Sequence, residues 1–269
     1  MAIDREWAQR VRAAIICNGL PDRDYLYHLK LDFDPNAQLL AIRRLLDRNA
    51  ESEAELVKQI RQVEEHAAKF TGILEAYAYE GCVDLYMEST YQGAAHSMAA
   101  VGLIAPYLET IFDQCFRAFK ASFCDNSLPS THPRWDLPED KAWDCRLAYT
   151  SGNKSQKNVV LGTSQLAEAI GLKKYLQTDF KQVHLALVTY RNSMFHNSVE
   201  WPVDERAQFQ KRIDNGEWPS DWFQTGTVDK KPWIYFMTRS FTNKCLETAD
   251  NVLEAFALLV KEHFEAICR

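Results

Sequence analysis

Hydrophobic residues near the C-terminal end of the sequence recur every three or four positions. The residues that follow this spacing are Phe241, Cys245, Ala249, Val252, Leu253, Phe256, Val260, Phe264 and Ile267. An α-helix turns once in 3.6 residues, so this spacing places the apolar side chains on one face. The pattern predicts a long amphipathic helix over 241–267.

Weaker helical patterns occupy most of the preceding chain. They predict helices over 4–18, 52–79, 92–123, 163–170 and 178–196, and a helical turn or two near 204–213. A further helix is predicted to follow the loop with Pro21 and Pro35 and to end at Leu46. Ser52 precedes Glu55 by three residues, which is a capping box and favours a helix start there. We expect Pro106 to kink or restart the helix over 92–123.

Two segments, at about 124–162 and 197–237, break this periodicity. They are rich in proline, serine, asparagine and tryptophan, and only Val159–Leu161 has the character of a short strand. We find no pattern that predicts a ladder of strands. The sequence therefore predicts an all-α fold in a single domain over 1–269, with two long irregular insertions.

Composition limits the possible functions. The chain has 269 residues, 46% of them hydrophobic, and a net charge of −6, so nucleic-acid binding would need a local basic patch. Its seven scattered cysteines form no Cys-x-x-Cys pair, and no Glu-x-x-His, His-Glu-x-x-His, Gly-x-Ser-x-Gly or phosphate-loop motif occurs. We expect no metal and no cofactor, and cysteines that serve as small core residues.

The expected location follows from the N-terminal and the weakly polar segments. The N-terminal stretch is charged from Asp4 onward, which does not fit a signal peptide. The longest weakly polar stretch, Ser97–Leu108, is too short to cross a bilayer. We therefore expect a soluble, cytoplasmic protein with no membrane partner.

An arginine followed five positions later by a histidine occurs three times. The pairs are Arg23 with His28, Arg61 with His66, and Arg191 with His196. Sixteen arginines and seven histidines would give about 0.4 such pairs by chance, so the spacing alone is a weak signal. On a continuous helix, residues five apart point about 140° away from each other. We expect the first pair in a loop and the second on a solvated helix face.

The third pair lies where an apolar helix meets a polar cluster. Arg191 is followed by Asn192, and Asn197-Ser198 come directly after His196. We expect the helix to fray there, so that the backbone can turn Arg191 and His196 toward one phosphate. The alternative is helix capping, in which cations near the last carbonyls interact favourably with the helix dipole. The residues alone favour neither interpretation.

An apolar helix that carries Arg191, Asn192 and His196, followed by a long amphipathic helix, resembles the HEPN superfamily. Its signature is Arg-x4–6-His, usually with Asn, Asp or His after the arginine, and all three positions match. The resemblance covers roughly 92–269 and leaves 1–91 as added N-terminal helices. It implies a HEPN-like antiparallel helical bundle that forms a homodimer and acts as a metal-independent endoribonuclease, a toxin or phage-defence effector, with RNA and an antitoxin or regulatory protein as partners.

The chain departs from the family pattern in two places. The Trp-rich insertion at 197–237 is longer than usual between the motif and the last helix. Ser198 stands where the toxin–antitoxin branch often carries a modified tyrosine, which argues against that form of regulation. Because the family also includes inactive members, the alternative function is a non-catalytic helical module that binds nucleotide, RNA or a partner protein.

The candidate catalytic residues suit RNA cleavage by 2′-hydroxyl attack. His196 can transfer protons near neutral pH, and the guanidinium of Arg191 can bind phosphate oxygens. Asn192 can donate a further hydrogen bond or orient His196. One motif supplies one histidine, so a two-fold dimer would supply both an acid and a base. The expected products are a 2′,3′-cyclic phosphate and a 5′-hydroxyl.

The stretch from Arg146 to His196 provides a local positive charge of +5, with seven basic and two acidic residues. Its lysines are the candidates for RNA binding: Lys154, Lys157, Lys173, Lys174 and Lys181. The alternative is an ordinary solvated surface. Six tryptophans follow residue 134. They can stack on unpaired bases, but more often such residues attach long loops to the core.

Overall fold

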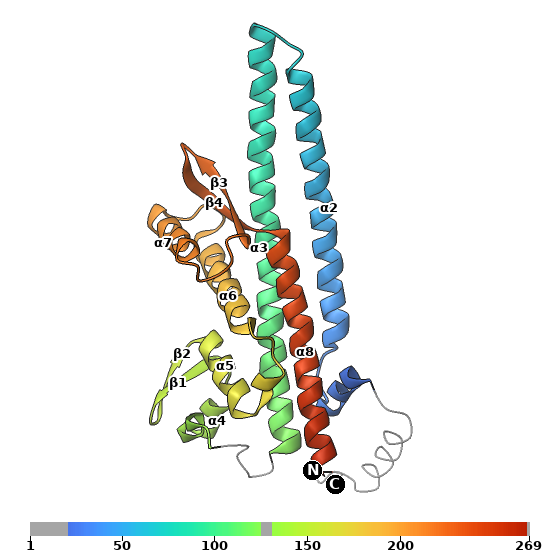
Figure 1. Ribbon diagram of the computed structural model, residues 1–269, viewed down its shortest axis with the longest axis vertical. Helices are drawn as coiled ribbons and strands as arrows, with labels where there is room; N and C mark the ends of the chain where they lie inside the picture. The colour runs from blue at the N-terminus through green and yellow to red at the C-terminus, as the bar shows by residue number, and fades with distance from the viewer. Residues whose placement is uncertain (1–20, 125–130, 268–269) are drawn as a thin grey trace. The chain divides into compact units, whose positions relative to one another are not determined.

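The computed structural model describes residues 21–124 and 131–267, which are mostly helical (Figure 1). The α-helices are α2 (Pro35–Ala67), α3 (Ile73–Phe123), α4 (Glu139–Ala142), α5 (Val159–Ala169), α6 (Phe180–Asn197), α7 (Val203–Asp214) and α8 (Arg239–Ile267). Within the described residues, the 3-10 helices are η1 (Asp22–Leu29), η2 (Pro133–Asp136) and η3 (Leu172–Lys174). The predicted all-α class is confirmed, and α7 and α8 lie where the sequence predicts them. The helix predicted over 4–18 lies outside the described residues.

Two antiparallel β-hairpins interrupt the helices, so the prediction that no strands pair is wrong. Strand β1 (Leu147–Ser151) pairs with β2 (Lys154–Lys157), and β3 (Phe223–Val228) pairs with β4 (Lys231–Met237). The second hairpin turns at Asp229 and Lys230, whose φ angles are 49° and 62°. Two positive φ angles fit the tight turns that join twisted strands, but Asp-Lys lacks the glycine that normally marks such a turn.

The chain forms two compact units, each built from separate segments. The first unit contains the described parts of Met1–Pro35, Leu108–Phe180 and Ala249–Arg269. The second unit contains Asn36–Tyr107 and Lys181–Thr248. Helices α3 and α8 each contribute residues to both units.

The core of the first unit forms where the last part of α3 meets the last part of α8. The rings of Phe112 and Phe116 both contact Phe256, with centroid distances of 5.8 Å and 5.4 Å. The segment Arg23–His28, expected to be a loop, forms most of the 3-10 helix η1. The imidazole of His28 stacks on Phe264 at 4.7 Å between ring centroids, which anchors η1 to α8.

A buried arginine organises the irregular part of the first unit. The guanidinium of Arg134 is fully buried and donates hydrogen bonds to the carbonyl oxygens of Ala142, Asp144, Leu147 and Gly162, and to Oε1 of Gln165. Gly162 permits this close packing, because a Cβ there would lie 2.4 Å from the carbonyl oxygen of Cys145. Arg134 therefore joins η2, α4, β1 and α5 through hydrogen bonds to their backbone carbonyl oxygens.

The start of α5 differs from the sequence prediction. Val159–Leu161, predicted to be strand-like, forms the first turn of this helix. The side chain of Asn158 caps it by accepting a hydrogen bond from the backbone N–H of Leu161. Thr163, at which the sequence predicts this helix to begin, is instead buried inside α5. The Asn158 cap directly before Val159 outweighs the local β-propensity of the Val-Val-Leu run.

In the second unit, α2 and the first part of α3 form a long antiparallel helical hairpin (Figure 1). The chain turns between them at 68–72, where Gly72 has a φ of 69°. Ser52 lies inside α2, so the predicted capping box is wrong. Its hydroxyl oxygen accepts a hydrogen bond from Nε2 of Gln92 at 2.9 Å, which ties α2 to α3. Helix α3 also continues through Pro106.

The Trp-rich insertion wraps an aromatic core of the second unit. Trp201, Phe209, Trp218, Phe223 and Tyr235 pack around one another and are buried. The hydroxyl of Tyr190 on α6 donates to the carbonyl oxygen of Tyr235 at 2.9 Å. For these tryptophans the interpretation as loop anchors is confirmed.

Candidate functional site

The Arg-x4-His motif lies on the last turns of α6, in the second unit. The helix continues through Asn197, so the predicted fraying between Arg191 and His196 is wrong. Two buried side chains, Tyr190 and Met194, hold this part of α6 against the core. The amide of Asn197 donates back to the carbonyl oxygen of Ser193 at 3.2 Å, and the chain leaves the helix at Ser198, whose φ is 61°.

Within this helix, Asn192 links the arginine to the face that carries the histidine. Nε and Nη2 of Arg191 both donate to Oδ1 of Asn192, at 3.2 Å and 3.1 Å. Arg191 and His196 leave the helix axis about 140° apart, whereas Asn192 and His196 are only about 40° apart. Asn192 and His196 are exposed, and Arg191 is half-buried. The arginine therefore reaches the histidine's face through its bond to Asn192.

A second histidine on α6, His184, is unsuited to proton transfer. It is buried, with 1% of its surface exposed. Burial, and to a smaller extent the positive charge of Arg191, lowers the pKa of His184 from 6.5 to about 4. An imidazole with such a pKa is neutral at physiological pH, which fits a packing role in the core.

The candidate RNA-binding lysines differ in their surroundings. Lys154 and Lys157 are exposed on β2, and Lys181 is exposed near the start of α6. Lys173 forms an ion pair with Glu168 at 3.0 Å, and Lys174 forms one with Glu262 at 2.6 Å. The hydrogen bond to Glu262 raises the pKa of Lys174. These acidic partners partly neutralise the charge that the sequence assigns to Lys173 and Lys174.

These lysines do not belong to one compact unit. Lys154, Lys157, Lys173 and Lys174 lie in the first unit, whereas Lys181 lies in the second unit with the motif. The contiguous basic stretch of the sequence is thus divided between units. Only Lys181 shares a unit with Arg191, Asn192 and His196.

A small pocket of about 50 Å³ lies elsewhere in the second unit. Its lining comes from α2, α3, the end of β4 and the start of α8, and includes Glu53, His96, Ser97, Arg239 and Asn243. Nδ1 of His96 lies 2.7 Å from Oε1 of Glu53. No local motif brings these residues together, so sequence reasoning has no signal for this pocket.

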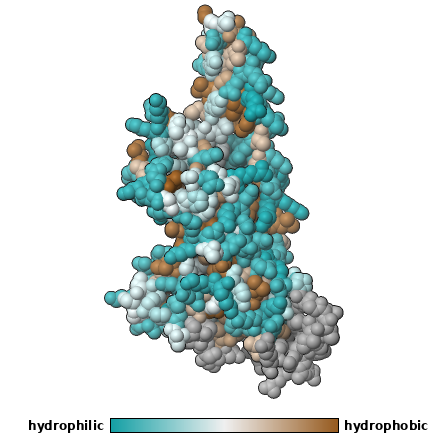
Figure 2. All heavy atoms as spheres, in the orientation of Figure 1, coloured by the Kyte–Doolittle hydropathy of each residue, from teal (hydrophilic) through white to brown (hydrophobic). Residues whose placement is uncertain are grey.

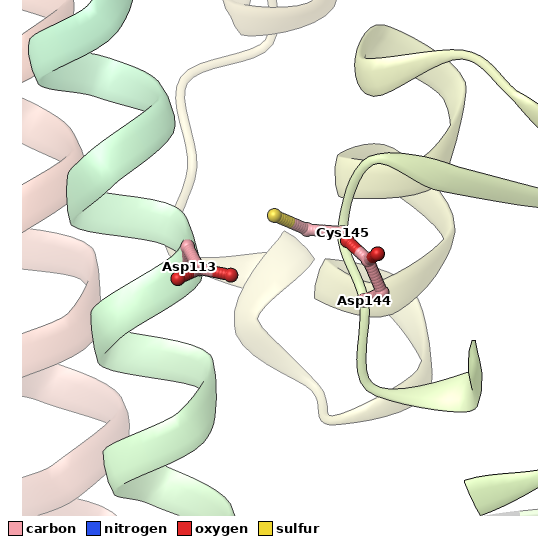
Figure 3. Close-up of side chains that lie close together, drawn as sticks. All are labelled: Asp113, Asp144 and Cys145. Atoms are coloured by element: carbon pink, nitrogen blue, oxygen red, sulfur yellow. The ribbon is translucent and has the colours of Figure 1, made fainter. Parts of the chain in front are cut away.

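Three side chains with metal-binding atoms lie within 4.8 Å of one another in the first unit: Asp113, Asp144 and Cys145 (Figure 3). Arginines already contact both carboxylates. Arg117 lies 3.0 Å from Asp113, and Arg146 lies 2.9 Å from Asp144 and 3.8 Å from Asp113. The cluster is therefore an ion-pair network in this structure.

The protonation of the cluster agrees with that interpretation. Burial raises the pKa of the Cys145 thiol to about 12, so the thiol is protonated at neutral pH. Burial also acts to raise the pKa of Asp144, but the hydrogen bonds from Arg146 outweigh it and lower this pKa. The carboxylate of Asp144 is thus ionised and matched by an arginine.

Buried thiols elsewhere fit the predicted core role of the cysteines. Cys82, Cys115, Cys145 and Cys245 are buried and free, and Cys124 is half-buried. Cys17 and Cys268 lie outside the described residues. Across the described ranges, no helix has the length and apolar character needed to span a bilayer.

Comparison of the chain with protein-family models, with characterised proteins and with solved structures found no match.

Proposed function

We propose that this chain is a metal-independent endoribonuclease with Arg191, Asn192 and His196 as its catalytic residues. The observation that supports this most is the pair of hydrogen bonds from Arg191 to Asn192, on the exposed last turns of α6, one turn before His196. This arrangement places a permanent positive charge and a titratable imidazole near one face of a rigid helix. A phosphodiester that approaches this face would meet both groups.

The proposed reaction needs no group beyond the RNA and side chains of this chain. A neutral His196 takes the proton from the 2′-hydroxyl, and the 2′-oxygen attacks the adjacent phosphorus. Arg191, positioned by Asn192, stabilises the negative charge of the phosphorane. The bond to the 5′-oxygen then breaks, and a protonated histidine donates a proton to that oxygen. The products are a 2′,3′-cyclic phosphate and a 5′-hydroxyl.

The second histidine comes from a second copy of the chain, so the proposed enzyme is a homodimer. Because α6 is continuous, one copy cannot turn its own Arg191 and His196 directly toward each other. Two motifs related by a two-fold axis would supply a base from one copy and an acid from the other. Light scattering tests this: an active protein that is monomeric at micromolar concentration would contradict the dimer.

The HEPN-like bundle, the toxin or phage-defence role, the antitoxin or regulatory partner and the cytoplasmic location are parts of the same proposal. They depend on the resemblance of Arg191, Asn192 and His196 to the family signature. The cleavage test below addresses the chemistry that all of them require.

The decisive experiment compares His196→Ala with His66→Ala on mixed RNA substrates. His66 has the same spacing from an arginine, but it is exposed near the end of α2 and belongs to no proposed site. Loss of proton transfer should slow cleavage by about a hundred- to ten-thousand-fold in the first variant and leave the second unchanged. Equal rates for His196→Ala and the parent protein, or inhibition of the parent by EDTA, would contradict the mechanism.

A second candidate function is the non-catalytic module that binds nucleotide, RNA or a partner protein. It is favoured by the position of the pocket around His96 and Arg239, which does not include the motif. Under this alternative, the parent protein binds RNA or nucleotide but releases no cyclic phosphate. It also predicts that His196→Ala leaves binding unchanged while His96→Ala weakens it.

A further inference from the structure

The free end of the α2–α3 hairpin exposes an aromatic and aliphatic surface. Its exposed residues on the first turns of α3 are Ile73, Leu74, Tyr77, Tyr79, Val83, Tyr86, Met87 and Tyr91, with side chains 38% to 78% exposed. Figure 2 shows hydrophobic and hydrophilic atoms intermixed in this region. We call these eight residues the tip surface. Several large apolar side chains exposed on one segment commonly mark an interaction site.

Two tyrosine rings of the tip surface are held in position by hydrogen bonds from their hydroxyl groups. The hydroxyl of Tyr86 donates a hydrogen bond to the Glu64 carboxylate of α2, and about half of the side chain, 49%, stays exposed. The hydroxyl of Tyr91 likewise donates to Glu200. These hydrogen bonds hold the rings of Tyr86 and Tyr91 in place, which lowers the entropy lost when a partner covers them.

The charges around the tip surface are of one sign. Residues 73–91 contain four acidic residues, Glu75, Glu80, Asp84 and Glu88, and no lysine or arginine. All four are exposed. Over 51–91, nine acidic residues face three basic ones, a net charge of −6 that equals the net charge of the whole chain. The hairpin end is therefore both apolar and strongly negative.

This combination discriminates between possible partners. RNA and anionic membranes would be repelled, and a second copy would bring an equal negative charge to the same place. A basic partner would make two kinds of favourable contact. Its arginine and lysine side chains are attracted to the faces of the tyrosine rings, and they pair with the carboxylates. Tyrosine and arginine are also the residues that dominate many protein interfaces.

We propose that the tip surface binds a basic amphipathic segment of another protein, in which lysine or arginine alternates with apolar side chains at helical spacing. The apolar side chains would lie against Tyr77 and Val83, and the cations would pair with Glu80, Asp84 and Glu88. This site is separate from the residues of the proposed ribonuclease, and it would bring a protein partner, not substrate, to the second unit.

Fluorescence anisotropy with labelled helical peptides tests the proposal on the full chain. The probe combines leucines at helical spacing with arginines; one control peptide has the same composition scrambled, and another has glutamate in place of arginine. The parent should bind the probe at least about tenfold more tightly than either control. Double variants then separate the two contributions.

Tyr77→Ser with Val83→Ser should weaken probe binding by about tenfold or more, because exposed positions can lose their apolar contacts without unfolding the helix. Glu80→Lys with Asp84→Lys should reverse the preference toward the glutamate peptide. The matched control, Asp140→Lys with Glu247→Lys, changes the net charge equally at exposed positions outside the tip surface and should bind like the parent. Circular dichroism verifies that each variant keeps its helix content.

Several results would overturn the proposal. One is a parent protein that does not prefer the probe over both control peptides. Another is equal loss of binding in the matched control, which would indicate attraction by net charge alone. Competition by an RNA oligonucleotide that is lost in Tyr77→Ser with Val83→Ser would assign the surface to nucleic acid. Loss of a dimer in the same variant, seen by light scattering, would assign it to a second copy.

Discussion

Arg191 gives two hydrogen bonds to a single oxygen of its neighbour Asn192, from Nε at 3.2 Å and from Nη2 at 3.1 Å. The contact orients the guanidinium fork beside the side of α6 that carries His196. An arginine held in this way loses less conformational entropy when it binds a phosphate. The asparagine is therefore a positioning residue in the proposed site.

Replacing Asn192 by alanine should lower RNA cleavage by about ten- to a hundredfold, because a misplaced guanidinium stabilises the phosphorane less well. The effect should be mainly on kcat, and Asn192→Asp, which keeps an oxygen acceptor for Arg191, should retain more activity than the alanine variant. Asn197→Ala is the matched control, since its amide donates only within the same helix end. An equal loss in both alanine variants would assign Asn192 to helix stability instead.

The lysines should contribute unequally to RNA binding. Lys154→Ala with Lys157→Ala should reduce the slope of log affinity against log salt by up to about two, because each phosphate contact releases counterions. Lys173→Ala with Lys174→Ala should reduce it less, since Glu168 and Glu262 already pair with these lysines. Filter binding over a salt series measures both slopes. A larger change in the second variant would reverse the assignment.

His184 should make the protein less stable in mild acid. The pKa of His184 is about 4 in the folded state, against an ordinary value of 6.5. Between pH 4 and pH 6.5, the imidazole is therefore protonated in the unfolded chain and neutral in the folded chain. The free energy of unfolding should therefore fall as the pH drops from 6.5 toward 4, by about 2 kcal/mol from this group between pH 8 and pH 5.

The matched variant for this prediction is His184→Leu, which cannot titrate. Urea unfolding at pH 8 and at pH 5 gives the change in unfolding free energy for both proteins. The parent should lose about 2 kcal/mol more than the variant over this interval. Parallel losses would show that His184 does not control this part of the pH profile.

Arg134→Leu should destabilise the first unit by about 3 to 5 kcal/mol, because it removes the charged donor of several buried hydrogen bonds to carbonyl oxygens. Urea unfolding followed by circular dichroism gives the difference from the parent. Arg117→Leu is a suitable control, since Arg117 is 62% exposed and its ion pair with Asp113 should contribute less than about 1 kcal/mol. Similar losses in the two variants would contradict the organising role of Arg134.

The sequence predicted the helices whose signals lie within the helix itself. Helix α8 follows from an apolar stripe that continues over its whole length, and α7 lies where a weak pattern near 204–213 predicts a helical turn or two. The burial of Trp201 and Trp218 also followed from their chemistry. The family resemblance, the ribonuclease activity and the single domain stay predictions.

Other elements depend on contacts between distant residues. Ser52 has the sequence of a helix cap, but its bond to Gln92 lies on the face of a helix that continues through it. The polar residues after Arg191 suggest a frayed end, yet the buried Tyr190 and Met194 keep α6 regular. Arg134 has no sequence signal at all, since its acceptors are backbone carbonyls brought together only by folding.

The charge of the hairpin end that carries the tip surface also affects the solubility of the protein. Residues 51–91 account for the full formal charge of −6, so the remaining residues are neutral in sum. Electrostatic repulsion between copies keeps concentrated protein in solution, and it weakens as net charge approaches zero. A truncated protein without this hairpin would thus become isoelectric near neutral pH, and its solubility would depend on salt and concentration far more than that of the full chain.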